Sequence, residues 1–267
     1  MKHLLSFLFL LLAVTASAQD TLSYQRKDNI PYRTGEQDAY MRERCVLDVY
    51  YPSRPAKLPV IVWFHGGGIT GGNKFIPKEL MKQGVVVMAV NYRLSPKVSC
   101  PAYIEDAAAA VAFAFRHAAE YGGDTSRIYV AGHSAGGYLT AMVGLDKQWL
   151  ARYNLDANRI AALFPFSSQA ITHFTVRNER KIPELTPIID AFAPLYHVRP
   201  DAPPLFLYTG DREKEMMGRY EENAYWARMM QLAGHKNTHL YEFDGYEHGN
   251  MPGPAYPLML QEIRKRK

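Results

Sequence analysis

The sequence predicts a doubly wound, mostly parallel α/β sheet with helices on both faces. Short apolar runs rich in β-branched and aromatic residues alternate with helical patterns along most of the chain. Several of these runs are apolar throughout, which is typical of strands that are covered on both faces. Because crossovers between parallel strands are right-handed, this alternation favours a sheet with helices packed on either side.

The elements follow in a regular order. Strands are expected at residues 45–51, 60–64, 85–90, 127–132, 160–166, 205–209 and 239–243. Helices are expected at 101–121, 135–145 and 216–233, and glycines at 122–123 and 234 follow two of them as stop signals. The Pro-rich segment 167–204 is an insertion between two strands, and loops of this length usually carry or cover a site.

The first eighteen residues have the pattern of a secretory signal peptide. Lys2 precedes an apolar run at 4–14, and Ala-Ser-Ala at 16–18 matches a cleavage site. The run is too short for a permanent bilayer-spanning anchor, although an N-terminal membrane helix is the alternative. We therefore expect a secreted or periplasmic protein that begins near Gln19 and forms one domain over 19–267.

Composition excludes several classes of function. The formal net charge is +5, but the basic residues are scattered, so no nucleic-acid-binding stripe is expected. No Cys/His cluster has the spacing of zinc ligands, so no metal is expected. Cys45 and Cys100 could pair in an oxidising compartment, but their spacing leaves this open.

Glycines at 66, 68 and 71 follow a predicted strand with the G-x-G-x-x-G spacing of a dinucleotide-binding turn. That function needs an acidic residue at the end of the next strand, about 20 residues on. The next strand instead runs into Asn91-Tyr92-Arg93. This loop is therefore not expected to bind a nucleotide.

A second glycine motif, G-x-S-x-G at 132–136, lies between a predicted strand and a predicted helix. This is the nucleophile elbow, in which glycines remove side chains that would block a sharp turn around Ser134. The turn places the serine at a helix N-terminus, which favours developing negative charge. We expect the N–H groups of Gly67, Gly68 and Ala135 to form the oxyanion hole.

These motifs together resemble the α/β-hydrolase superfamily. The segments "HGGG" (65–68), "NYRLSP" (91–96) and "GGDTSRIYVAGHSAGG" (122–137) are similar to its acetyl-esterase and hormone-sensitive-lipase-like branch, including secreted bacterial feruloyl/acetyl-xylan esterase-like proteins. The resemblance implies a single catalytic domain and no cofactor. His133 stands where that branch usually has Asp, and residues 19–44 leave little room for its N-terminal helical cap.

The rest of a serine triad should follow Ser134 in the order acid, then histidine. His248 lies just beyond the last predicted strand and fits the family's catalytic histidine, whereas His239 lies inside that strand. The resemblance implies an acid three residues after Gly210, which is Glu213, with Asp211 as the alternative. Glu215 is expected to face solvent at the start of a helix.

The predicted function is hydrolysis of short-chain acyl or carbohydrate-linked esters through an acyl-enzyme. Its partner would be a small-molecule or polysaccharide ester, with Gln169, His173 and Phe174 as candidate substrate contacts. An amidase, arylformamidase or peptidase on the same scaffold is the alternative. A binding protein that has kept only the fold is a third possibility, and the oligomeric state stays open.

Overall fold

The computed structural model describes residues 22–35 and 37–266. The predicted signal peptide at 1–18 and the expected start near Gln19 lie outside the described residues.

One sheet of eight strands forms the centre of the molecule, in the order β1-β2-β4-β3-β5-β6-β7-β8. The pairs β1–β2 and β2–β4 are antiparallel and every other pair is parallel. The strands are β1 (Tyr24–Pro31), β2 (Val46–Pro52), β3 (Leu58–Phe64), β4 (Val86–Val90), β5 (Gly123–His133), β6 (Ala162–Phe166), β7 (Leu205–Gly210) and β8 (Thr238–Phe243).

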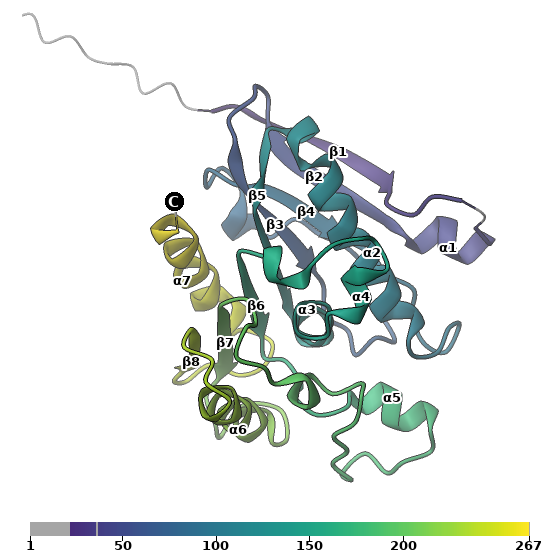
Figure 1. Ribbon diagram of the computed structural model, residues 1–267, viewed down its shortest axis with the longest axis vertical. Coiled ribbons are helices and arrows are strands. Elements are labelled where there is room, and N and C mark those ends of the chain that lie inside the picture. The colour runs from purple at the N-terminus through teal and green to yellow at the C-terminus, as the bar shows by residue number, and fades with distance from the viewer. Residues whose placement is uncertain (1–21, 36, 267) are drawn as a thin grey trace, which may run out of the picture.

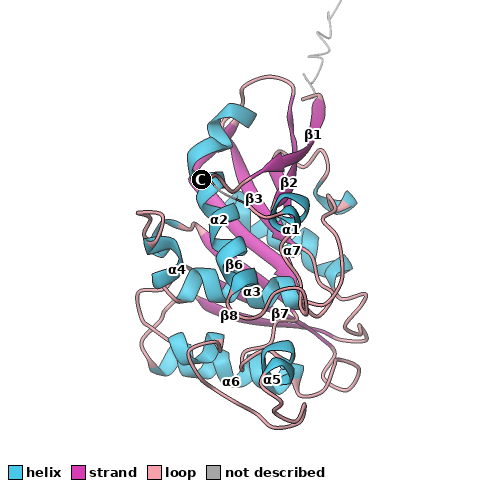
Figure 2. Ribbon diagram, turned by 90° about the vertical axis from the view of Figure 1, so that its right-hand side faces the viewer, coloured by secondary structure: helices cyan, strands magenta, loops and turns pink. Residues whose placement is uncertain are grey.

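Helices cover both faces of this sheet, as Figure 1 and Figure 2 show. The α-helices are α1 (Ala39–Arg44), α2 (Ala102–His117), α3 (Ala135–Leu145), α4 (Gln148–Ala151), α5 (Phe174–Glu179), α6 (Arg219–Leu232) and α7 (Pro252–Lys265). Short 3₁₀ turns are η1 (Lys78–Leu80), η2 (Ala118–Tyr121), η3 (Ala157–Arg159) and η4 (Pro194–His197).

The core has two parts, one on each face of the sheet. The larger part packs α2, α3 and α6 against one face, and the smaller packs α7 and η1 against the other. From Pro59 to Phe64, every residue of β3 is buried, as expected for a central strand that is covered on both sides. The predicted fold class is therefore confirmed.

Strand β1 is the element that the sequence pattern missed. Its sequence, YQRKDNIP, is polar, and most of its residues are exposed because it pairs only with β2 at the edge of the sheet. Charged side chains and a terminal proline are common protection for such an edge. Hydrophobic periodicity gives no signal for a strand of this kind.

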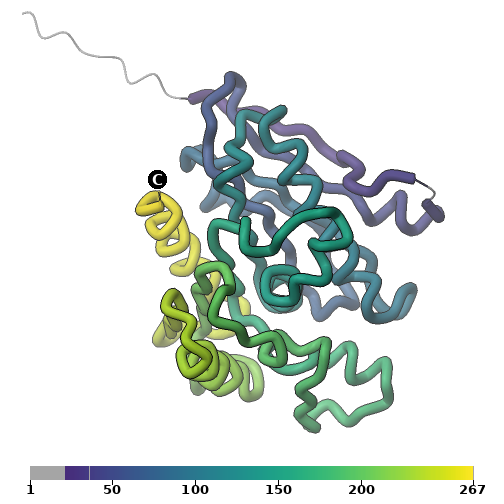
Figure 3. The backbone as a smooth tube through the Cα atoms, in the orientation of Figure 1, coloured from purple at the N-terminus to yellow at the C-terminus, as the bar shows by residue number. Residues whose placement is uncertain are grey.

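The carboxyl ends of the parallel strands meet at one edge, and the loops that follow them gather there. The chain leaves the sheet after β6 and returns at β7, as the green part of the trace in Figure 3 shows. This insertion contains α5 and η4.

Three further features concern the described residues alone. Cys45 is buried and Cys100 is partly exposed, and both are free thiols, so they are not paired. In residues 22–35 and 37–266, no helix is long and apolar enough to cross a membrane. The same residues contain no group of three or more His, Cys, Asp or Glu side chains placed to hold a metal ion.

Candidate active site

Ser134 lies at the sharp turn between β5 and α3. Its backbone has φ 56° and ψ −117°, a strained conformation for a residue with a side chain, and strain of this kind is concentrated at functional sites. A Cβ on Gly132 would lie 2.4 Å from the Gly136 carbonyl oxygen, and one on Gly136 would lie 2.1 Å from that of Phe64. Both glycines are therefore needed for the chain to turn here.

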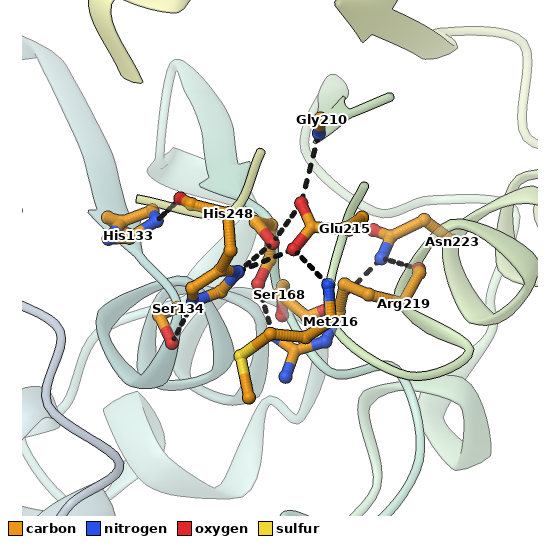
Figure 4. A network of polar contacts seen from close by, with 10 residues as sticks. His133, Ser134, Ser168, Gly210, Glu215, Met216, Arg219, Asn223 and His248 are labelled. Carbon is orange, nitrogen blue, oxygen red and sulfur yellow. Dashed lines mark hydrogen bonds and ion pairs between the residues drawn. The ribbon is translucent and has the colours of Figure 1, made fainter. Parts of the chain in front are cut away.

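His248 faces the serine from the loop that follows β8. Its Nε2 lies 2.9 Å from the Ser134 Oγ, as Figure 4 shows. The Nε2 of His133 lies 2.9 Å from the His248 carbonyl oxygen, and the two rings pack with centroids 4.8 Å apart. Burial, followed by the neighbouring His248, lowers the pKa of His133 to about 4. His133 is therefore neutral at physiological pH and donates Nε2–H to the backbone of the histidine loop.

The carboxylate that binds His248 belongs to Glu215. Its Oε1 lies 2.6 Å from the His248 Nδ1, and its side chain is 0% exposed. Because a carboxylate accepts the Nδ1–H, the unprotonated Nε2 is left facing the Ser134 hydroxyl. The structure thus brings Ser134 and His248 together, as the sequence predicts. The acid that contacts His248 is not one of the two predicted residues.

A tight turn after β7 brings Glu215 back to the end of that strand. The N–H of Glu215 donates to the Asp211 carbonyl oxygen, and its Oε2 accepts the Gly210 N–H at 3.0 Å. The Met216 N–H donates to Oε1 at 2.8 Å. Burial alone raises the pKa of Glu215, but hydrogen bonds led by that from His248 outweigh it, and the pKa falls to about 2.

The predictions of Glu213, or else Asp211, as the acid are corrected by this geometry. Glu213 is exposed, and its N–H bonds the Asp211 Oδ1. Asp211 accepts the Gly245 N–H on Oδ2 at 2.8 Å, and its own N–H donates to the Tyr246 carbonyl oxygen. Asp211 therefore fixes the loop that carries His248. The expected helix start at 216 is also three residues too early, because α6 begins at Arg219.

Ser167, which the sequence analysis did not single out, is a further member of this network. It follows β6, is fully buried and has φ 46°. Its Oγ donates to the Glu215 Oε2 at 2.7 Å and lies 2.8 Å from the His248 Nδ1. No motif marks this serine, since its role depends on the packing of β6 beside β7.

The glycine loop after β3 packs against the nucleophile. A Cβ on Gly66 would lie 3.3 Å from the Ser134 Cβ, and Gly67 and Gly68 have φ values of 111° and 62°. Within the described part of the chain, no acceptor is bound to the N–H of Gly67 or Gly68. Ala135 is the first residue of α3, so its N–H has no acceptor inside the helix. These donors suit a developing oxyanion.

Known proteins share this architecture. The family described as BD-FAE matches residues 47–176. A solved structure, the truncated form of a carbohydrate esterase from gut microbiota, has a TM-score of 0.75 at 20% identity over 93% of this chain and 98% of that chain. Esterase 2 of Thermogutta terrifontis has a TM-score of 0.68 at 22% identity over 90% of this chain and 92% of that chain. The chain has the α/β-hydrolase fold.

Curated relatives match parts of this chain. The probable carboxylic ester hydrolase LipM of Mycobacterium tuberculosis is 30% identical over 57% of this chain and 40% of the relative. Carboxylesterase NlhH of the same organism is 42% identical over 36% of this chain and 32% of the relative. The chain therefore spans less than two thirds of either relative.

The insertion between β6 and β7 contains the three predicted substrate contacts. Gln169 and Phe174 line a cavity beside the site, and the Phe174 ring lies 3.0 Å from the position of a Cβ on Gly68. His173 is 1% exposed and does not line the cavity, and its Nδ1 accepts the Thr175 N–H at the start of α5. The prediction for His173 is therefore wrong, because its ring is used to build the insertion.

Proposed function

We propose that this protein is a secreted or periplasmic serine carboxylesterase that hydrolyses short-chain acyl or carbohydrate-linked esters. The observation that carries the proposal is the continuous chain of contacts from Ser134 through His248 to the buried carboxylate of Glu215. Residues 19–267 would form its single catalytic domain. The names of the relatives, carboxylic ester hydrolase and carboxylesterase, support an ester as the substrate.

The first step is attack on the ester carbonyl. His248 takes the Ser134 proton on Nε2, and the Oγ adds to the carbonyl carbon. The negative charge of Glu215 stabilises the imidazolium that forms. The oxyanion accepts hydrogen bonds from the N–H groups of Gly68 and Ala135, together with that of Gly67.

The second step releases the acid. His248 gives its proton to the leaving alcohol, and the acyl group stays on the Ser134 Oγ. A water molecule then enters, and the same histidine accepts its proton as the water attacks the acyl carbonyl. Collapse of the second tetrahedral intermediate returns the proton to Ser134 and frees the carboxylic acid.

Purified protein and its Ser134→Ala variant test this proposal. We expect p-nitrophenyl acetate to be hydrolysed by the parent chain and not by the variant, and acetate or ferulate to be released from acylated xylan. A fluorophosphonate probe should add its mass to Ser134 in the parent chain alone. Turnover that persists in the variant would overturn the serine mechanism. Cleavage of the small ester without release from xylan would support the esterase activity but rule out the polysaccharide as its substrate.

A further inference from the structure

A cavity of about 360 Å³ lies between the insertion and the N-terminal turn of α6. Its size is in the range of small-molecule sites. Apolar side chains form much of its wall, among them Phe174, Leu185, Met216 and Met217. The exposed fraction is 76% for Leu185 and 63% for Met217, so these two lie at its mouth.

This cavity adjoins the candidate triad. Met216 directly follows Glu215, and in Figure 4 its side chain extends from the acid toward Ser134. Arg219 lines the cavity and donates from Nη1 to the Ser167 carbonyl oxygen. The Oγ of Ser167 in turn contacts both Glu215 and His248. A group bound in the cavity would therefore contact residues that adjoin the triad, whereas Ser134, His248 and Glu215 do not themselves line the cavity.

Two buried guanidinium groups line the same cavity. Arg177 is 3% exposed and Arg219 is 2% exposed. Arg177 donates from Nη1 to the carbonyl oxygens of Glu184 and Thr186, while the Nε of each arginine has no hydrogen-bond partner. Neither arginine has a carboxylate oxygen at ion-pair distance in residues 22–35 or 37–266, although the negative charges of Glu222 and Glu215 act on Arg219. Both positive charges are thus buried with backbone carbonyls as their acceptors.

Three acidic residues, Glu184, Glu221 and Glu222, also line the cavity. The Oε2 of Glu222 accepts the N–H groups of Ala170 and Ile171, and burial raises the pKa of this carboxyl. Glu221 pairs at 2.7 Å with Arg212, which does not line the cavity. The third acid, Glu184, is exposed to solvent. The Nε atoms of Arg177 and Arg219 are therefore buried donors that lack an acceptor.

A buried guanidinium without a paired anion is unfavourable, because the interior replaces its hydration only through hydrogen bonds and opposite charge. Oxygen atoms of a ligand can supply both. A carboxylate suits the planar fork of an arginine better than a hydroxyl does, since its two oxygens can accept two parallel bonds.

We propose that the cavity binds a second, free carboxylate of the substrate, held by Arg219 with Arg177. The substrates are then esters whose acid or alcohol part carries an ionised carboxylate in addition to the reacting ester. This inference rests on the proposed esterase function. It adds the charge of the substrate and the residues that select it.

A matched pair of acetyl esters tests the inference. 4-Acetoxybenzoate and 4-acetoxybenzamide have nearly the same shape and differ in the charge of one group. Calorimetry on the Ser134→Ala variant measures binding of each intact ester without turnover. We expect the benzoate to bind about tenfold more tightly than the benzamide, with a preference that weakens as salt is added.

Two arginine variants locate the effect. Arg219→Gln in the Ser134→Ala background should make the binding of the two esters equal. The control Arg152→Gln should keep the preference, because Arg152 pairs with Glu105 outside the cavity. Circular dichroism checks folding, and Arg177→Gln serves as the second cavity variant if Arg219→Gln does not fold. Equal binding of the two esters by the parent variant would overturn the inference.

Kinetics of the active protein separate this inference from the esterase proposal. We expect kcat/KM to favour the benzoate over the benzamide. Ser134-dependent turnover of both esters at equal rates would support the esterase proposal and overturn the inference of a carboxylate site. A charge preference in binding with no turnover of either ester would overturn the esterase proposal alone.

Discussion

Substitution of Glu215 by Gln tests which carboxylate serves His248. In the structure the carboxylate accepts four hydrogen bonds, two on each oxygen. Oε1 accepts from His248 and the Met216 N–H, and Oε2 accepts from Ser167 and the Gly210 N–H. An amide has one oxygen and one NH₂ group. Whichever way Gln is turned, its NH₂ therefore faces one of the two backbone N–H groups.

The larger effect is on the chemistry. A neutral amide cannot stabilise the imidazolium that forms when Ser134 attacks, and one of its two orientations also holds His248 in the wrong tautomer. In a serine protease the equivalent change lowers kcat about 10⁴-fold, so we expect a loss of about 10³- to 10⁴-fold here. This equals about 4–5.5 kcal/mol of transition-state stabilisation. KM should change little, because the Glu215 side chain is fully buried.

The assay is steady-state hydrolysis of p-nitrophenyl acetate, with circular dichroism to confirm folding of each variant. Glu213→Gln is the matched control, and it should stay within about twofold of the parent because Glu213 is exposed. Asp211→Asn should mainly lower stability, because it weakens the hydrogen bond from the Gly245 N–H. A large loss of kcat in Glu213→Gln, with Glu215→Gln near the parent value, would refute the assignment.

Three further outcomes are expected. His133→Phe keeps a ring but removes the donor to the His248 carbonyl oxygen, so kcat should fall about tenfold at constant KM. A tenfold rise in KM at unchanged kcat would contradict a positioning role for His133. The pKa of Glu215 is depressed from 4.5 to about 2, so its stabilisation is complete above pH 4.5 and is lost as pH falls toward 2. Urea unfolding should therefore show the parent and Glu215→Gln differing by up to about 3 kcal/mol near neutral pH and converging in acid. Asp106→Asn leaves the buried Arg93 without its carboxylate, and unfolding should show a loss of about 3–5 kcal/mol with unchanged kcat per folded molecule.

The sheet was largely predictable because its strands are buried on both faces. Continuous apolar runs such as 60–64 and 85–90 are typical of strands that are covered on both faces, and both runs form central strands of the sheet. The edge strand β1 does not need apolar residues, because most of its side chains are exposed to solvent. Short helices such as α5 were also missed, because their stability comes from packing rather than from a repeating pattern.

The candidate site divides in the same way. Ser134 is predictable because its turn needs glycines two residues before and two residues after it. This requirement is local, so a short stretch of sequence is enough to show it. His248 was found because it follows the last strand directly. The acid was assigned by counting from Gly210, but the turn at 211–215 reverses the chain and directs the fifth residue, not the third, toward the histidine.

The sequence by itself determined the sheet, the serine turn and the loop that holds the histidine, since each depends on residues close together in the chain. Only the tertiary structure decided which residues meet around His248: Glu215 from the turn after β7, Ser167 directly after β6 and His133 at the end of β5. It also decided that Arg177 and Arg219 line one cavity. Contacts between distant segments depend on packing and turn geometry, and these leave no local pattern in the sequence.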